Sequence, residues 1–210
     1  MNNPSHQIRV LSVDDHPLMR EGIARIISDQ PDITLIAQAA TGAEAVRQFR
    51  QYRPDVTLLD LRLPDMSGID VLIAIRTEFA DAKVLVLTTA TGDVEIQRAL
   101  KAGARGYILK SMSPPEMTDA IRHVYHGKKH VPPEVAAQIA EHMGEPELTN
   151  RELEVLRHLA GGNRNRDIGD LLFVSEETIK AHVKSIMEKL GASDRTEAIA
   201  IAVRRGIMQL

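Results

Sequence analysis

Hydrophobic and polar positions follow a mixed strand and helix pattern over roughly the first 127 residues. Short runs rich in β-branched residues and leucine alternate there with longer amphipathic segments. The runs predict strands at residues 8–13, 33–37, 55–60, 83–88 and 106–109. The amphipathic segments predict helices at residues 17–29, 42–52, 68–78, 92–103 and 114–126. Because strands and helices alternate five times, we expect an α/β fold with a five-stranded, doubly wound parallel sheet.

The pattern changes after Gly127. One short helix is predicted from Glu134 to His142, and Gly144-Glu145-Pro146 is typical of a linker. From Leu148 onward only helical periodicity remains. The sequence therefore predicts an α/β domain at 1–128, a linker with a short helix at 129–147, and an all-α domain at 148–210. A chain of 210 residues is long enough for two such domains with separate cores.

Composition narrows the range of functions. The chain has no cysteine, which excludes disulfides, zinc–thiolate sites and thiol catalysis. Its polar first residues do not resemble a signal peptide, and no apolar stretch approaches the length of a membrane span. We expect a soluble, cytoplasmic protein. The net charge of −3 gives no indication of nucleic-acid binding, so that function has to be judged from local patterns.

Five polar side chains directly follow or end four of the predicted strands: Asp14, Asp15, Asp60, Thr88 and Lys110. In open α/β sheets, the ligand crevice lies beyond the carboxyl ends of the strands. The sequence therefore predicts that three carboxylates, a hydroxyl and an ammonium group meet in one pocket. Each residue alone has a simpler interpretation, since an Asp-Asp pair can cap a helix and Lys110 can be a solvated surface residue.

Such a pocket would suit phosphoryl chemistry. Mg²⁺ prefers oxygen ligands and retains several waters, so two or three carboxylates and a phosphate are a natural site for it. We expect Asp15 and Asp60 to be ligands, with Asp14 helping directly or through water. Asp60 follows the third strand and is the best candidate for a nucleophile that forms an acyl phosphate. Lys110 would offset charge on the transferred oxygens, and Thr88 would donate a hydrogen bond to them.

The last sixty residues predict a helix-turn-helix. A helix capped at Thr149 or Asn150 ends at Gly161-Gly162, a short second helix follows, and Ser175 caps a third. The third helix places apolar residues on one face and a polar set on the other: Lys180, Ala181, Lys184 and Ser185. Residues 163–210 hold eight Lys or Arg and seven Asp or Glu. Because this charge is nearly balanced, periodicity alone favours a merely solvated face.

The first domain resembles the receiver domains of bacterial two-component response regulators. The motifs are Val13-Asp14-Asp15-His16, Leu59-Asp60-Leu61-Arg62-Leu63-Pro64-Asp65-Met66-Ser67-Gly68, Leu87-Thr88-Thr89-Ala90, and residues 102–110 from Ala102 to Lys110. The resemblance implies a flavodoxin-like receiver in which Asp60 takes a phosphoryl group from a sensor histidine kinase. Mg²⁺ would be held by Asp14, Asp15, Asp60 and the main-chain carbonyl of Arg62. Thr88, Tyr107 and Lys110 would contact or respond to the phosphoryl group.

The second domain resembles the LuxR-type DNA-binding domain, so that the whole chain is similar to NarL/FixJ-type response regulators. The matching segments are 148–156, Asn165-Arg166-Asp167-Ile168, 174–183, Lys189-Leu190-Gly191 and Arg195-Thr196. By this resemblance Lys180, Ala181 and Lys184 face base edges of double-stranded promoter DNA. Phosphates would be contacted by Thr178, His182, Ser185 and Arg195. The family usually has alanine at Gly169, where glycine should cost about 0.5–1 kcal/mol of helix propensity or permit a close contact.

The final segment 198–203 is apolar nearly all round. It is consistent either with a fully buried core helix or with a helix that meets a second copy. In the family the last helix dimerises on DNA, which assigns Ile199, Ala202 and Val203 to a homodimer face used when the protein is phosphorylated or DNA-bound. RNA polymerase is a further expected partner, and a membrane is not.

We interpret the chain as a transcription factor in which a receiver controls a DNA-binding domain through the linker. Two other classes stay open on sequence grounds. A phosphoaspartyl phosphatase is one, although Arg62 stands where the best-known enzymes of that chemistry carry a second aspartate. The other is a phosphate-independent regulator or protein-interaction module whose DNA face is unused.

Overall fold

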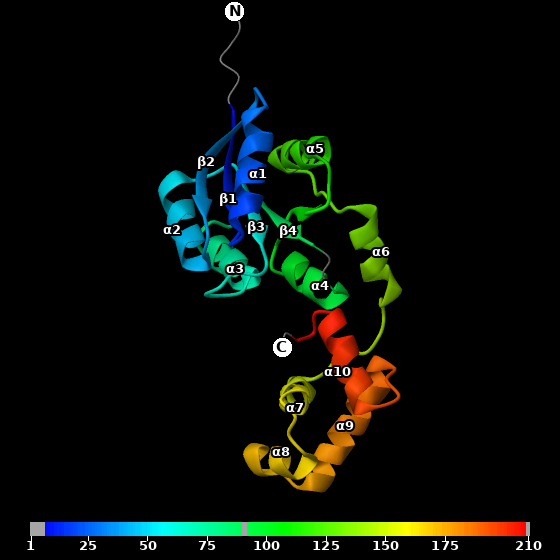
Figure 1. Ribbon diagram of the computed structural model, residues 1–210. Coiled ribbons are helices and arrows are strands. Elements are labelled where there is room, and N and C mark those ends of the chain that lie inside the picture. The colour runs from blue at the N-terminus through cyan, green and yellow to red at the C-terminus, as the bar shows by residue number, and fades with distance from the viewer. Residues whose placement is uncertain (1–6, 90–91, 209–210) are drawn as a thin grey trace, which may run out of the picture. The chain divides into compact units, whose positions relative to one another are not determined.

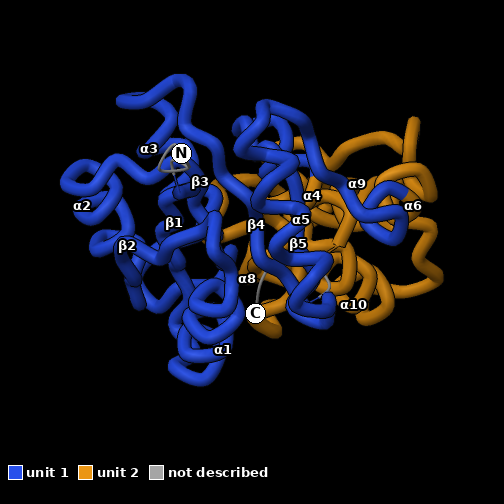
Figure 2. Tube along the Cα trace, turned by 90° about the horizontal axis from the view of Figure 1, so that it is seen from above, with its two compact units in different colours: residues 1–90, 97–136 blue, residues 91–96, 137–210 orange. Residues whose placement is uncertain are grey.

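The computed structural model describes residues 7–89 and 92–208. The chain forms two compact units, coloured separately in Figure 2. The first contains residues 1–90 and 97–136, and the second contains residues 91–96 and 137–210. Within the described residues, no helix combines the length and the apolar character needed to cross a membrane.

The first unit contains a five-stranded sheet in the order β2-β1-β3-β4-β5, and every neighbouring pair is parallel. The strands are β1 (Ile8–Val13), β2 (Ile33–Ala39), β3 (Val56–Asp60), β4 (Val84–Thr88) and β5 (Gly106–Leu109). The helices that connect or follow them are α1 (Pro17–Ser28), α2 (Gly42–Tyr52), α3 (Gly68–Glu78), α4 (Asp93–Lys101) and α5 (Pro114–Tyr125). The predicted doubly wound parallel sheet is confirmed.

Helices cover both faces of the sheet, which is why its strands are almost continuously apolar. Figure 1 shows α1 and α5 on one face and α2 and α3 on the other. The α1 and α5 face buries a cluster that includes Ile23, Leu58, Ile108 and Ile121. Strands β3 and β4 are buried at every position. Their carboxyl ends are therefore fixed by packing on both sides of the sheet.

Local hydrogen bonds explain where several helices begin. Thr41 precedes α2, and its hydroxyl accepts the Glu44 amide at 3.2 Å. The same helix end is held from another loop, because the Asp65 carboxylate accepts the amides of Gly42 at 2.7 Å and Ala43 at 2.9 Å. Those hydrogen bonds lower the pKa of Asp65, with the Ala43 amide as the largest cause. Asp65 thereby connects the loop after β3 to α2.

The second unit is helical. Its helices are α7 (Asn150–Ala160), α8 (Asn165–Leu172), α9 (Glu176–Leu190) and α10 (Arg195–Arg204), and α6 (Pro133–Glu141) crosses from the first unit into it. Thr149 and Glu152 form a reciprocal capping box at the start of α7, and Ser175 caps α9. Phe173, with φ of 55°, ends α8 in the left-handed region. Apolar residues from all four helices α7 to α10 share one core.

Gly169 in α8 permits a close approach of the helix to the turn that follows it. The Gly169 carbonyl accepts the Val174 amide at 2.9 Å, and an added Cβ would lie 2.8 Å from the Val174 carbonyl oxygen. Real Cβ atoms do not approach backbone oxygens so closely, so a side chain there would displace the turn before α9. The sequence left open whether this glycine only costs helix propensity or permits a close contact. The structure has the close contact.

Two glycine-to-alanine substitutions are expected to change stability in opposite directions. Gly169→Ala should lower the free energy of unfolding of the helical unit by about 1–2 kcal/mol, because overpacking against the turn outweighs helix propensity. Gly22→Ala should raise the stability of the first unit by about 0.5–1 kcal/mol, because Gly22 lies exposed in α1 and no atom of the described residues lies within 4 Å of an added Cβ. Urea unfolding read by hydrogen exchange in peptides from each unit measures both changes. A stabilised Gly169→Ala variant would contradict the steric account.

Candidate metal centre and nucleic-acid interface

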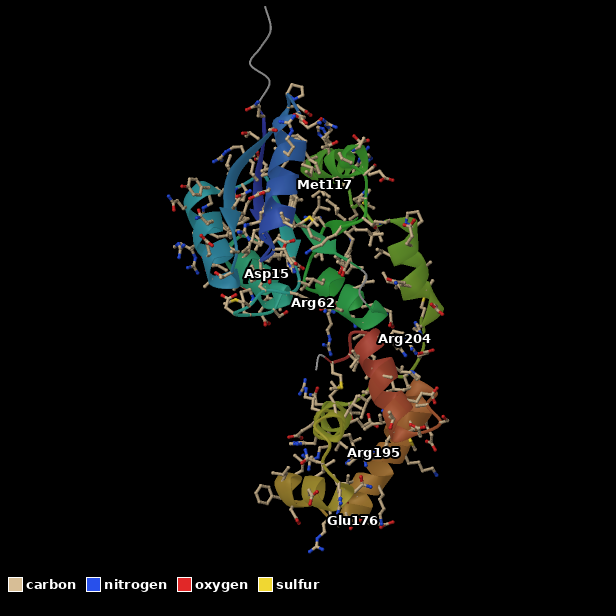
Figure 3. All side chains as sticks on the ribbon, in the orientation of Figure 1. Asp15, Arg62, Met117, Glu176, Arg195 and Arg204 are labelled. Atoms are coloured by element: carbon tan, nitrogen blue, oxygen red, sulfur yellow. The ribbon has the colours of Figure 1, made fainter. Side chains whose placement is uncertain are left out.

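The predicted pocket residues are brought together by strand register. Val13 in β1 lies opposite Leu59 in β3, so Asp14 follows β1 at the level where Asp60 ends β3. Between β3 and β4, Asp60 lies opposite Leu87, and between β4 and β5, Thr88 lies opposite Leu109. Lys110 follows β5 directly, and its amide donates to the Thr88 carbonyl at 2.7 Å. Figure 3 labels Asp15 and Arg62 at this edge of the sheet.

Lys110 connects the acidic residues. Its Nζ lies 2.7 Å from Asp14 Oδ2 and 2.6 Å from Asp60 Oδ2, and both carboxylates are almost completely buried. Burial by itself would lower the pKa of Lys110, but the nearby carboxylates of Asp14 and Asp60 outweigh it and raise the pKa. The ammonium group is therefore charged at neutral pH and partly neutralises two acids that repel each other.

The donor set fits a divalent cation. Ligand atoms of Asp14, Asp15, His16 and Asp60 all lie within 4.8 Å of one another. Three of these four are carboxylates, the ligands that a hard cation such as Mg²⁺ prefers. The Thr88 hydroxyl is buried and finds no hydrogen-bond partner among the described residues, although a buried hydroxyl normally has one. A phosphoryl oxygen in the pocket would supply that partner.

The loop after β3 packs closely on Asp60. The Arg62 amide donates to Asp60 Oδ1 at 3.1 Å, and the Gly68 amide donates to the Leu61 carbonyl at 2.9 Å. A Cβ on Gly68 would lie 2.2 Å from the Asp60 carbonyl oxygen, so only glycine fits there. Asp60 is thereby held by both its strand and the returning loop.

Tyr107, the predicted partner of Thr88, lies in β5 two residues before Leu109 and is completely buried.

Helix α9 presents the predicted DNA-contacting residues on a different face from its core residues. Ile179, Ile186 and Leu190 are buried. Thr178, Lys180, Ala181 and Lys184 are exposed, and His182 and Ser185 are half-buried. Thr178 also takes part in the N-cap, where its amide donates to Ser175 Oγ at 3.1 Å. Figure 3 labels Glu176 at the start of this helix and Arg195 at the start of α10.

Two residues expected to contact phosphates have partners inside the domain. The Ser185 hydroxyl donates to Glu152 Oε1 at 2.7 Å, which connects α9 to α7. The Arg195 guanidinium donates to the Asn163 carbonyl at 3.1 Å but remains exposed. Ser185 therefore has a definite structural role, whereas Arg195 keeps free donor capacity for a phosphate.

Comparison with known proteins identifies the family. Residues 10–122 match the response regulator receiver domain, and residues 146–202 match the LuxR family of bacterial regulatory proteins. The chain belongs to the response regulators. It binds DNA through its LuxR-type helix-turn-helix and regulates transcription, and it is not a conventional enzyme.

Several individual proteins are similar to this response regulator along nearly its whole length. The transcriptional regulatory protein LiaR of Bacillus subtilis is 39% identical, and the match covers 96% of this chain and 99% of LiaR. A crystal structure of ChrA, the response regulator of a heme-sensing two-component system, is 34% identical with a TM-score of 0.58, and the match covers 96% of this chain and 99% of ChrA. A complex of the response regulator RcsB with DNA is 25% identical with a TM-score of 0.72, covering 93% and 98% of the two chains.

The three residues expected on a dimer face of the last helix of the response regulator differ in burial. Ala202 is completely buried within the core of the helical unit, together with Ala198. Ile199 is half-buried, and Val203 is 36% exposed. The dimer face stays a prediction, and Ile199 and Val203 are its accessible members. An apolar helix has no periodicity from which its buried face can be identified.

Two residues outside the predicted set hold the pocket in place. The Arg20 guanidinium donates to the Asp14 carbonyl at 2.7 Å. The His16 amide donates to Asp14 Oδ1 at 2.8 Å, and its ring Nδ1 lies 2.7 Å from Asp15 Oδ1. Arg20 follows His16 by one helical turn at the start of α1. This spacing could have indicated that both side chains lie near the Asp14-Asp15 segment. Both residues fix the Asp14-Asp15 segment that the response regulator presents to a cation.

Proposed function

We propose that Asp60 is the phosphoacceptor of this response regulator and that the donor is the phosphohistidine of a sensor histidine kinase. The observation that carries the proposal is the ion pairing of Lys110 Nζ with both Asp14 and Asp60 at the carboxyl edge of the sheet. An ammonium group so close to the acceptor can offset the charge that develops on the transferred oxygens.

The transfer breaks the P–N bond of the phosphohistidine and forms a bond between phosphorus and an Asp60 carboxylate oxygen. The Arg62 amide and Lys110 orient the two Asp60 oxygens, since they contact Oδ1 and Oδ2 respectively. Thr88 then donates its buried hydroxyl to a phosphoryl oxygen, and the buried Tyr107 packs behind it. Asp14, Asp15, Asp60 and the Arg62 carbonyl would hold Mg²⁺, which when bound neutralises charge on the carboxylates and the phosphoryl group.

The helical unit would place α9 in the major groove of promoter DNA. Lys180, Ala181 and Lys184 would meet base edges, and Thr178, His182 and Arg195 would meet phosphates. Ile199 and Val203 on α10 remain as candidate dimer contacts, and RNA polymerase would be the further partner in transcription. A protein that binds promoter DNA and takes its phosphoryl group from a kinase would act in the cytoplasm.

Phosphorylation of Asp60 would shift the population toward a form that dimerises and binds DNA. A test compares promoter binding by the full chain before and after acetyl phosphate with Mg²⁺. Couplings between sites are typically 5- to 150-fold, so we expect wild-type affinity to rise by about that factor. Asp60→Asn should not respond, and Asp55→Asn, which alters a carboxylate at the opposite end of β3, should respond like wild type. Equal binding by wild type and Asp60→Asn after treatment would overturn gating by phosphate.

A further inference from the structure

The exposed face of α9 carries an acidic residue among its expected DNA contacts. Glu177, Lys180, Ala181 and Lys184 are spaced at i, i+3, i+4 and i+7, so their side chains occupy one stripe of the helix. All four are exposed, and the Glu177 side chain is 83% exposed. A carboxylate in this position would approach DNA together with the two lysines.

Glu177 contacts one of those lysines. Lys180 Nζ lies 3.2 Å from Glu177 Oε2 and 3.5 Å from Glu176 Oε1. The Glu177 hydrogen bond is the largest cause that raises the pKa of Lys180. Within the described part of the chain, no other side-chain partner of Glu177 is found. The glutamate therefore holds the ammonium group in the middle of the stripe.

Helix formation does not require the Glu177 side chain. Ser175 supplies the N-cap oxygen, which accepts the Thr178 amide at 3.1 Å. Glu176 also places an acidic group in the first turn, where it interacts favourably with the helix dipole. A carboxylate that faces the phosphate-rich surface of DNA is unfavourable unless it finds a donor there. The start of α9 therefore has a cap and a first-turn acid without Glu177, whose side chain is exposed and contacts Lys180.

We propose that Glu177 is a specificity residue that accepts a hydrogen bond from the N4 amino group of a cytosine in the major groove. The first residues of a recognition helix are those that reach base edges, and a carboxylate is the natural acceptor for cytosine N4. Lys180, one turn further along, donates to guanine O6 and N7 at the neighbouring base pair. Guanine and thymine present acceptors in the groove and repel the carboxylate, and adenine presents a donor beside an acceptor. The expected order of preference is cytosine, then adenine, then the other two bases.

This inference rests on the proposed docking of α9 in the major groove and adds a base preference to it. The competing explanation is that Glu177 merely neutralises Lys180. In that case, removal of the carboxylate would strengthen binding to every DNA sequence alike. The two explanations differ in whether the selected sequence motif changes.

The experiment selects duplexes from a randomised library with the full-length chain treated with acetyl phosphate and Mg²⁺. Wild type, Glu177→Gln, Glu177→Ala and Glu188→Gln are compared. Glu188→Gln is the matched control, because Glu188 is exposed further along α9 and pairs with Lys184 at 3.7 Å. It removes the same charge from the distal half of the helix.

We expect one cytosine position per half-site in the wild-type motif, with about 5- to 150-fold discrimination, the range that 1–3 kcal/mol per base contact gives. Glu177→Ala should lose the preference at that position, and Glu177→Gln should shift it to adenine, whose N6 and N7 suit an amide. Glu188→Gln should keep the wild-type motif. An unchanged motif in both Glu177 variants would overturn the inference and leave the proposed DNA function intact. If wild type selects no motif, the proposed docking and this inference both fail.

Discussion

Replacing Lys110 by methionine is expected to slow phosphorylation of Asp60 about 100- to 1,000-fold, the usual effect of removing one charge-stabilising donor from a reaction site. Lys110 Nζ lies 2.6 Å from Asp60 Oδ2, and its side chain is only 10% exposed. Water therefore cannot efficiently compensate for the loss of its positive charge. Methionine keeps the length and apolar stem of the side chain, which separates the loss of charge from a loss of packing.

The same substitution should strengthen Mg²⁺ binding. Lys110 competes for Asp14 and Asp60 and repels a nearby cation, so its removal leaves the carboxylates free to bind the ion. We expect the Mg²⁺ affinity to rise by about tenfold or more, because charges a few ångströms apart interact by several kcal/mol in such a site. Tighter cation binding with slower phosphorylation is a combination that misfolding would not produce.

Calorimetric titration with MgCl₂ and intact-mass analysis during treatment with acetyl phosphate measure the two effects. Lys83→Met is the matched control, because Lys83 precedes β4 at the opposite edge of the sheet, where its Nζ donates to the Tyr125 carbonyl at 2.6 Å. That variant should phosphorylate and bind Mg²⁺ like wild type. A Lys110→Met protein that phosphorylates at the wild-type rate would refute the assigned role of the ammonium group.

The central features of the pocket could be predicted because strand ends are well marked in this sequence. Apolar runs buried on both faces of the sheet stop at a polar residue, and parallel strands bring those residues to one edge. Asp14, Asp60 and Lys110 follow from that pattern alone. Helix ends were predicted less closely, as with α4, which was expected at 92–103 and occupies Asp93–Lys101. The helix cannot extend through Gly103, because this residue adopts a φ of +99°, which lies outside the helical region.

Contacts across elements could not be predicted in the same way. Asp65 holds the start of α2, and Arg20 holds the Asp14 carbonyl, yet each depends on how a loop or a long side chain folds back in space. Ser185 was expected on the DNA face because helical periodicity places it beside Lys184. The periodicity of α9 carries no information about α7, where Glu152 accepts a hydrogen bond from the Ser185 hydroxyl. Buried polar partners on other helices are the main information that the sequence pattern lacks.

Glu152 is expected to be the polar residue on which the helical unit depends most for stability. It is 4% exposed and accepts hydrogen bonds from the Thr149 amide at 2.7 Å and the Ser185 hydroxyl at 2.7 Å. Its Oε2 also lies 2.7 Å from Lys189 Nζ. Burial would raise the pKa of Glu152, but Lys189, Ser185 and Thr149 together lower it to about 2 from an ordinary value of 4.5.

That pKa implies a definite dependence of stability on pH. Because the pKa is lower in the folded chain, the carboxylate contributes stability above about pH 4.5, and the contribution is lost as the pH falls toward 2. The size of the shift corresponds to about 3 kcal/mol. Glu152→Gln should therefore lower the free energy of unfolding of the helical unit by about 2–4 kcal/mol at pH 7, since it leaves Lys189 without its counter-charge.

Urea unfolding of the full chain from pH 7 to pH 3, read by hydrogen exchange in peptides of α7 and α9, measures this difference. The gap between wild type and Glu152→Gln should narrow as the pH falls below about 4.5, because unfolded wild type then binds a proton at Glu152 that the folded chain does not bind until the pH approaches 2. Glu154→Gln is the matched control: Glu154 is half exposed and pairs with Arg151 at 2.7 Å, so it should cost less than about 1 kcal/mol. A gap that stays constant across this pH range would show that the Glu152 charge does not stabilise the packing of α9 on α7.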